Sequence, residues 1–301
     1  MILSGIDAAN PLGYLAALGA FRLLSETGAN VQMRWVPDGV WRAELIGVEE
    51  QNEASICEEL LKAPRAPAEA FIELIANKNI TVDGVTFSKL STEAGQSALL
   101  EDRRAADFAA AFGSEVCEDA KKGRIEHTSF CFITGSGHQD FLDTMRALGE
   151  KTSASDLRRA LFMRWNYPDK GCSMRWDPGE AREYALRWKN PGPEGAWTEW
   201  GANRLAIEAL PLFPSFPVGR HLETTGFREA KPWEEFTWPV WQEAVTCDTV
   251  RSLVSLAELQ NDQPNRKLLG AVGISEVYRA QRIRIGAGAN FKVSFRPARS
   301  V

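Results

Sequence analysis

The sequence predicts an α+β fold that mixes helices with mostly antiparallel strands. Three observations indicate this class. Stretches of helical and of strand periodicity follow one another irregularly, several strand-like runs are joined by short hairpin turns, and the regular strand–helix–strand alternation of a doubly wound sheet is missing. The chain has 301 residues, of which 44% are hydrophobic, so it can bury a large core. We therefore expect no Rossmann-type parallel sheet.

The first element is expected to be a buried helix that begins at Asn10. Asparagine is a strong N-cap, and Pro11 suits the first helical position, whose N–H has no partner within the helix. Apolar side chains fall on every face over residues 12–24. An export signal would need a basic segment before this run, where Asp7 is the only charge, and a membrane span would need about 20 apolar residues. We therefore assign Asn10 and Pro11 a structural role.

The remaining elements follow from periodicity and turn residues. A Pro-Asp-Gly turn inside residues 31–47 predicts a hairpin. Amphipathic or helix-forming runs predict helices over residues 49–63, 66–79, 96–112, 140–150, 153–165, 200–213 and 247–259. We expect strands as a short pair over 80–88, as a run into a glycine loop over 127–138, in short pieces over 211–241, and as a pair around a glycine-rich turn over 274–301.

Composition changes near residue 166, where turn-forming and aromatic residues become frequent. This predicts an N-terminal α+β region over residues 1–165 and an aromatic- and proline-rich α+β region over residues 166–301. No linker separates the two regions, so one continuous domain is the alternative. Six of the ten tryptophans lie between residues 165 and 233, which predicts an aromatic core, an interface, or both.

Cysteine usage and charge narrow the classes of function. The five cysteines are an odd number without a CxxC pair, which argues against a disulfide framework and a zinc ribbon and favours a cytoplasmic protein. With three histidines in the chain, a histidine-rich metal site is not expected, and we assign no metal and no cofactor. The net charge of −5 gives no overall basic footprint, so any contact with nucleic acid must come from local patches or be shared with partner subunits.

Basic residues interleaved with aromatic ones form two such patches. Guanidinium groups suit phosphates, and aromatic faces suit stacked bases. In a strand, Arg282 and Arg284 point to the same face and can act as a phosphate clamp. The candidate nucleic-acid-binding residues are Arg158, Arg159, Arg164 and Arg175 in the first patch, and Arg282, Arg284 and Lys292 in the second. The alternative is solvated strands with cation–π packing inside the protein.

A glycine-containing loop is a further candidate site. Backbone N–H groups in such a loop before a helix can hold a phosphate, but neither GxGxxG nor GxxxxGK[ST] is present. The candidate phosphate-loop residues are Gly135, Ser136, Gly137 and His138. A tight turn without a ligand is the alternative. A hydrolase using Ser136, His138 and Asp140 is a rival hypothesis, although GSGHQ is not the GxSxG motif, and we assign no catalytic residue.

Three stretches together resemble a known group of proteins. They are IDAANPLGYLAALGAFRLL at residues 6–24, SMRWDP at 173–178 and GANRLAIEALPLFPSFPVGR at 201–220. Each is similar to a segment found in subunits of type I-G (formerly type I-U) CRISPR effector modules. The resemblance covers about one-fifth of the chain.

The resemblance implies a non-catalytic large-subunit-like or accessory component that helps an RNA-guided complex hold its target. In such complexes the guide RNA reads the sequence by base pairing, while protein contacts a flanking motif and the backbone. The implied partners are other CRISPR effector subunits and guide RNA, with target DNA as a further ligand and no membrane. We expect a subunit of an antiviral defence complex. The rival classes are the hydrolase above and a pure protein–protein interaction module.

Overall fold

The computed structural model describes residues 1–27, 30–48, 50–62, 79–99, 103–119, 121–132, 140–180, 197–285 and 292–301. Every strand pairing among these residues is antiparallel, and no parallel Rossmann-type sheet is evident among them. The α+β prediction is confirmed.

The helices occupy most of the positions that periodicity indicates. They are α1 (Pro11–Glu26), α2 (Glu53–Lys62), α3 (Gly84–Ala98), α4 (Arg104–Phe112), α5 (Phe141–Lys151), α6 (Ala154–Phe162), α7 (Trp200–Glu208), α8 (Cys247–Val254) and α9 (Arg266–Ala271), with the 3₁₀ helices η2 (Leu210–Leu212) and η3 (Ala257–Gln260). Within the described ranges, no helix is both long and apolar enough to cross a membrane.

The strands form one larger sheet and several small ones. They are β1 (Ile2–Leu3), β2 (Gln32–Asp38), β3 (Val40–Ile46), β4 (Gly113–Asp119), β5 (Arg124–His127), β6 (Asp169–Lys170), β7 (Trp197–Thr198), β8 (Ser215–Val218), β9 (His221–Thr224), β10 (Phe227–Ala230), β11 (Trp233–Trp241), β12 (Ile274–Ile285), β13 (Lys292–Phe295) and β14 (Arg299–Ser300). The larger sheet has the order β10-β11-β12-β13, with β14 also paired to β12.

Local capping chemistry sets the helix starts. The Asn10 side chain accepts hydrogen bonds from the N–H groups of Leu12 and Gly13, and Pro11 is the first helical residue, as predicted. Ser153 forms a capping box with Asp156 at the start of α6. The predicted hairpin over residues 31–47 is also confirmed as β2 and β3, because Gly39 supplies the positive φ that the turn requires.

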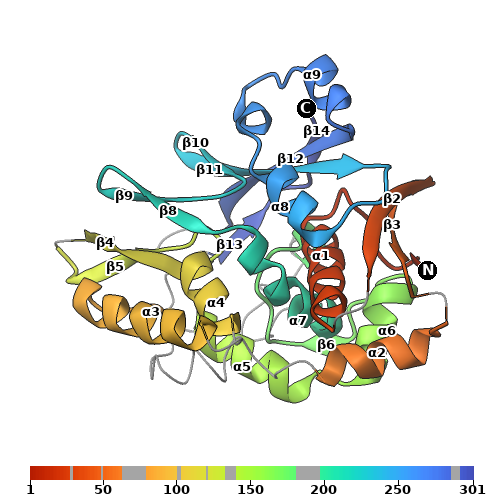
Figure 1. Ribbon diagram of the computed structural model, residues 1–301, viewed down its shortest axis with the longest axis horizontal. Coiled ribbons are helices and arrows are strands. Elements are labelled where there is room, and N and C mark those ends of the chain that lie inside the picture. Colours follow the sequence, from red (N-terminus) through yellow and green to blue (C-terminus); the bar gives the residue numbers. More distant parts are fainter. Residues whose placement is uncertain are drawn as a thin grey trace, which may run out of the picture.

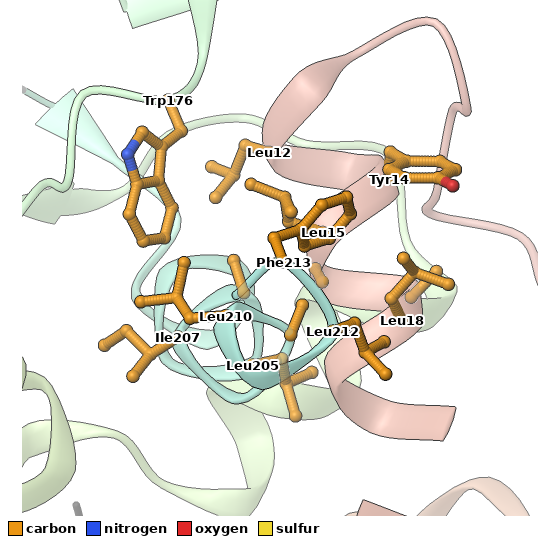
Figure 2. Packing of buried hydrophobic residues seen from close by; sticks show 14 of the residues in the cluster. Leu12, Tyr14, Leu15, Leu18, Trp176, Leu205, Ile207, Leu210, Leu212 and Phe213 are labelled. Atoms are coloured by element: carbon orange, nitrogen blue, oxygen red, sulfur yellow. The ribbon is translucent and has the colours of Figure 1, made fainter. Parts of the chain in front are cut away.

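The core is built around two helices that touch closely. Figure 1 shows α1 and α7 side by side in the middle of the molecule, with β11 and β12 above them and α2 and α5 along the lower edge. Gly19 permits this contact: a Cβ there would lie 1.8 Å from the carbonyl oxygen of Leu205 in α7. Figure 2 shows leucine side chains of α1 facing apolar side chains of α7 and η2, with Trp176 to one side of them. The two helices therefore meet backbone to backbone, and α1 is buried on every face as predicted.

Two polar contacts fix a third segment against this helix pair. The Asn10 side-chain amide donates to Asp177 Oδ1 at 2.9 Å. The backbone N–H of Met174 donates to Asn203 Oδ1, on α7, at 2.8 Å. Residues 173–178 therefore pack onto the start of α1 and the side of α7, and Trp176 becomes fully buried.

Tryptophans contribute strongly to this core. Trp35, Trp176, Trp238 and Trp241 are fully buried. The indole N–H of Trp238 donates to the carbonyl of Ala8, which ties β11 to the chain entering α1. Residues on both sides of position 166 share one hydrophobic cluster.

Several local predictions were wrong. Residues 80–88 do not form a strand pair, because the Asp83 carboxylate accepts the N–H of Thr86 at 2.7 Å and caps α3. The predicted helix over 96–112 is two helices, since α3 ends at Ala98 and α4 begins at Arg104. Of the strand predicted over 127–138, residues 133–138 lie outside the described ranges. Among the others only His127 is in a strand, at the end of β5, because the chain turns where the Cys131 N–H donates to the Thr128 carbonyl. The helix predicted over 66–79 lies almost wholly outside the described residues.

Candidate functional site

A pocket of about 330 Å³ lies at one end of the larger sheet, and we call it the Trp233 pocket. It is lined by Glu229, Lys231, Pro232, Trp233, Glu234, Arg282, Arg284 and Val293. The turn between β10 and β11 supplies one wall, and β12 with its neighbour β13 supplies the other. Antiparallel pairing of β11 with β12 brings these walls together from distant parts of the chain.

Arg282 and Arg284 meet in this pocket. They stand two residues apart on β12, so their side chains leave the same face of the strand, as the sequence predicts. Arg284 is exposed, and its guanidinium carbon lies 5.8 Å from the centre of the Trp233 ring. This geometry is a cation–π contact between an exposed cation and a half-exposed indole.

Arg282 is held by several neighbouring groups. Its Nη1 lies 2.6 Å from Glu234 Oε2, and it also donates to the Ser129 carbonyl at 3.3 Å. Its guanidinium stacks over Phe132 at 4.9 Å from the ring centre. Arg282 therefore connects the pocket wall to residues 129–132, and it positions Glu234 and this segment.

The pocket carries both signs of charge. Lys231, Arg282 and Arg284 are cationic, while Glu229 and Glu234 are carboxylates. Lys231 Nζ lies 3.4 Å from Glu229, and the lysine side chain is 82% exposed. The lining can therefore donate hydrogen bonds to phosphate oxygens and accept hydrogen bonds from amino groups.

The first predicted patch lies in a different part of the molecule and is largely engaged in ion pairs. Arg158 lies 2.8 Å from Glu53 in α2. Arg159 is surrounded by three carboxylates, those of Asp156, Asp169 and Glu199. Arg175 lies 3.8 Å from Glu180, and Arg164 is exposed. Their elements pack with α2 and α7 rather than with β12, so the structure does not join this patch to the second one.

The other predicted site residues are only partly described. Lys292 pairs with Ile285 at the start of β13, and its side chain lies outside what the structure describes. The candidate phosphate loop, Gly135, Ser136, Gly137 and His138, also lies outside the described residues. Asp140, named in the hydrolase hypothesis, accepts a hydrogen bond from the Asn79 amide at 2.9 Å. In the described ranges, no group of three or more His, Cys, Asp or Glu side chains is arranged to hold a metal ion.

A buried polar cluster around Glu180 was not predicted. The Glu180 carboxyl is hydrogen-bonded to the hydroxyls of Ser173 and Thr198. Burial, opposed by the nearby Arg175 guanidinium, raises the pKa of Glu180 to about 7. Three residues other than glycine close to it in sequence have positive φ values, namely Tyr167, Cys172 and Arg175. Such strained residues persist where surrounding contacts hold them, and here the backbone N–H groups of Tyr167 and Arg175 donate to Glu199 Oε1 and Ser173 Oγ.

The sequence contains a signal for part of this site but not for all of it. The i, i+2 spacing of Arg282 and Arg284 indicates a shared face. Lys231 and Trp233 lie in a proline-rich stretch, and nothing in the sequence around them indicates that they will lie beside β12. Thr198 and Asn203 likewise gain their roles only when α7 packs against residues 173–180.

Comparison with known proteins does not identify the chain, because no protein-family model and no curated protein matches it.

Proposed function

We propose that this protein is a non-catalytic, cytoplasmic subunit of a CRISPR type I-like RNA-guided antiviral defence complex. In this role it binds nucleic acid and helps assemble the complex with other effector subunits, guide RNA and target DNA. The observation that carries the nucleic-acid part is the Trp233 pocket, in which an indole, two arginines and a lysine line one hollow. Aromatic and basic groups in one site are typical of surfaces that bind nucleic acid.

The packing of the three similar stretches supports the part of the proposal that concerns the complex. Residues 6–24, 173–178 and 201–220 are far apart in the sequence, yet they contact each other in the core. Residues that related proteins share for structural reasons are expected to pack together in this way. The Trp233 pocket lies outside all three stretches, so it can differ among subunits with the same core.

The charge distribution suits a subunit that works with partners. A net charge of −5 disfavours general binding to a polyanion, whereas the exposed cations Lys231 and Arg284 at the rim of a local pocket can contact phosphates of a bound strand. Guide pairing supplies sequence recognition in an RNA-guided complex, so a subunit of this kind needs only to hold the backbone and exposed bases.

Reversing the two exposed cations of the pocket should weaken nucleic-acid binding. We expect the double variant Lys231→Glu/Arg284→Glu to reduce the dependence of log Kobs on log[salt]. Loss of two phosphate contacts makes this negative slope shallower by about 1.4 for a single strand. The measurement is fluorescence anisotropy with a labelled oligonucleotide from about 20 to 200 mM salt, a range in which counterion release is readily seen.

The matched control is Arg220→Glu/Lys267→Glu, which changes the net charge equally at exposed residues on other elements. It should leave the slope close to that of the wild type. Equal weakening by both double variants, or no binding by the wild type at low salt, would reject the Trp233 pocket as the nucleic-acid site.

A further inference from the structure

The lining of the Trp233 pocket is too mixed in charge for a phosphate alone. Two carboxylates, of Glu229 and Glu234, stand among its three cations. A phosphate placed between them would be repelled by both carboxylates, whereas a neutral aromatic group with hydrogen-bond donors would not. The ligand that suits the interior of the pocket therefore differs from the ligand that suits its rim.

We infer that the Trp233 pocket holds one unpaired nucleobase that carries an exocyclic amino group, stacked on the Trp233 indole. The inference rests on the proposed function and names the part of the nucleic acid that this site binds. Adenine, cytosine and guanine carry such an amino group, and uracil and thymine do not. The sugar–phosphate backbone on either side of the base remains at the rim, near Lys231 and Arg284.

Glu234 is placed to accept the amino group. Its side chain is 37% exposed, and its two oxygens already accept bonds from Arg282 at 2.6 Å and from the Ser129 hydroxyl at 2.7 Å. A carboxylate has about four lone-pair positions, so each oxygen can accept one further hydrogen bond. Because Arg282 and Ser129 fix the carboxylate, it is oriented before a ligand binds.

The apolar surfaces of the pocket favour a flat ring. Trp233 and Pro232 line the pocket from the start of β11 and the turn before it, and Val293, which is 5% exposed and pairs with Arg284, lines it from β13. A volume of about 330 Å³ is near the lower end of the range of ligand pockets, roughly 300–1,000 Å³, and suits one base rather than a base pair. A base inside a duplex would first have to leave the stack, so a single strand is the preferred ligand.

Anisotropy titrations of the full-length chain with labelled 12-nucleotide oligo(dC), oligo(dA), oligo(dT) and a duplex test this inference. We expect oligo(dC) and oligo(dA) to bind more tightly than oligo(dT) and the duplex. The Trp233→Ala variant should bind oligo(dC) about 5- to 150-fold more weakly than the wild type, because it loses one stacked base. The Trp233→Phe variant keeps an aromatic face and should retain most of the affinity.

Trp41→Ala is the matched control, because Trp41 is also half-buried but lies on β3, outside both arginine patches. It should bind like the wild type, and a thermal melt of every variant confirms that each one is folded. Equal binding by Trp233→Ala and wild type, or tightest binding to oligo(dT) or to duplex, would overturn the inference. If Trp233→Ala has no effect while Lys231→Glu/Arg284→Glu still weakens binding, the base site is rejected and the proposed nucleic-acid surface stands.

Discussion

The substitution Gly19→Ala should destabilise the protein by about 3 kcal/mol or more, which is the upper part of the usual range for an overpacked core. The added methyl group would lie 1.8 Å from the Leu205 carbonyl oxygen and 2.7 Å from its carbon. Both atoms belong to the backbone of α7, so no side-chain rotation relieves the clash. The two helices would have to separate, and the polar contacts of Asn203 with residues 173–178 would weaken with them.

Gly95→Ala is the control for helix propensity. Gly95 also lies within a helix, α3, and a Cβ there meets no atom within 4 Å. Alanine at this position should stabilise the protein by up to about 1 kcal/mol, because glycine is the poorer helix former. Urea denaturation followed by circular dichroism measures both variants. A Gly19→Ala protein as stable as the wild type would contradict the close packing of α1 and α7.

The substitution Glu180→Gln should remove a pH-dependent loss of stability. Burial raises the pKa of Glu180 from 4.5 to about 7 in the folded state. Between these values the folded protein binds more protons than the unfolded chain, so stability falls as pH rises. This difference corresponds to about 3 kcal/mol, lost progressively from pH 4.5 to pH 7. The glutamine amide has nearly the same shape and does not titrate.

The free energy of unfolding, measured in urea from pH 4 to pH 8, checks this expectation. The variant should gain on the wild type by up to about 3 kcal/mol across the window, and the gain should be complete above pH 7. Glu223→Gln, at an exposed position on β9, should show no such change with pH. A constant difference between Glu180→Gln and wild type at every pH would show that Glu180 titrates normally.

Local chemistry explains which elements the sequence reveals. Asn10 with Pro11, Ser153 with Asp156, and Gly39 at its turn each determine a boundary through their own backbone neighbours. The helix start at Asn10 and the hairpin around Gly39 are confirmed as predicted. The error over residues 80–88 has the same origin. Alternating apolar residues there resemble a strand, but Asp83 makes a helix cap, and the capping bond prevails.

The candidate site was less predictable because its residues meet across the fold. The shared face of Arg282 and Arg284 follows from strand geometry alone. That Glu234 and Trp233 join them depends on the pairing of β11 with β12, which no local pattern specifies. In the first patch, the carboxylates that surround Arg159 come from three separate segments, so no local pattern in the sequence indicates that this arginine is engaged in ion pairs.

The RNA content of the purified assembly tests the central claim most directly. The chain, carrying an affinity tag, is co-expressed with the genes that flank its own and with a CRISPR array, and the RNA that co-purifies is sequenced. Our account predicts recovery of the chain together with other subunits and with RNA of uniform length derived from the array. Recovery of the chain alone and free of RNA, with the array transcript processed and bound to other proteins in the same cells, would contradict it.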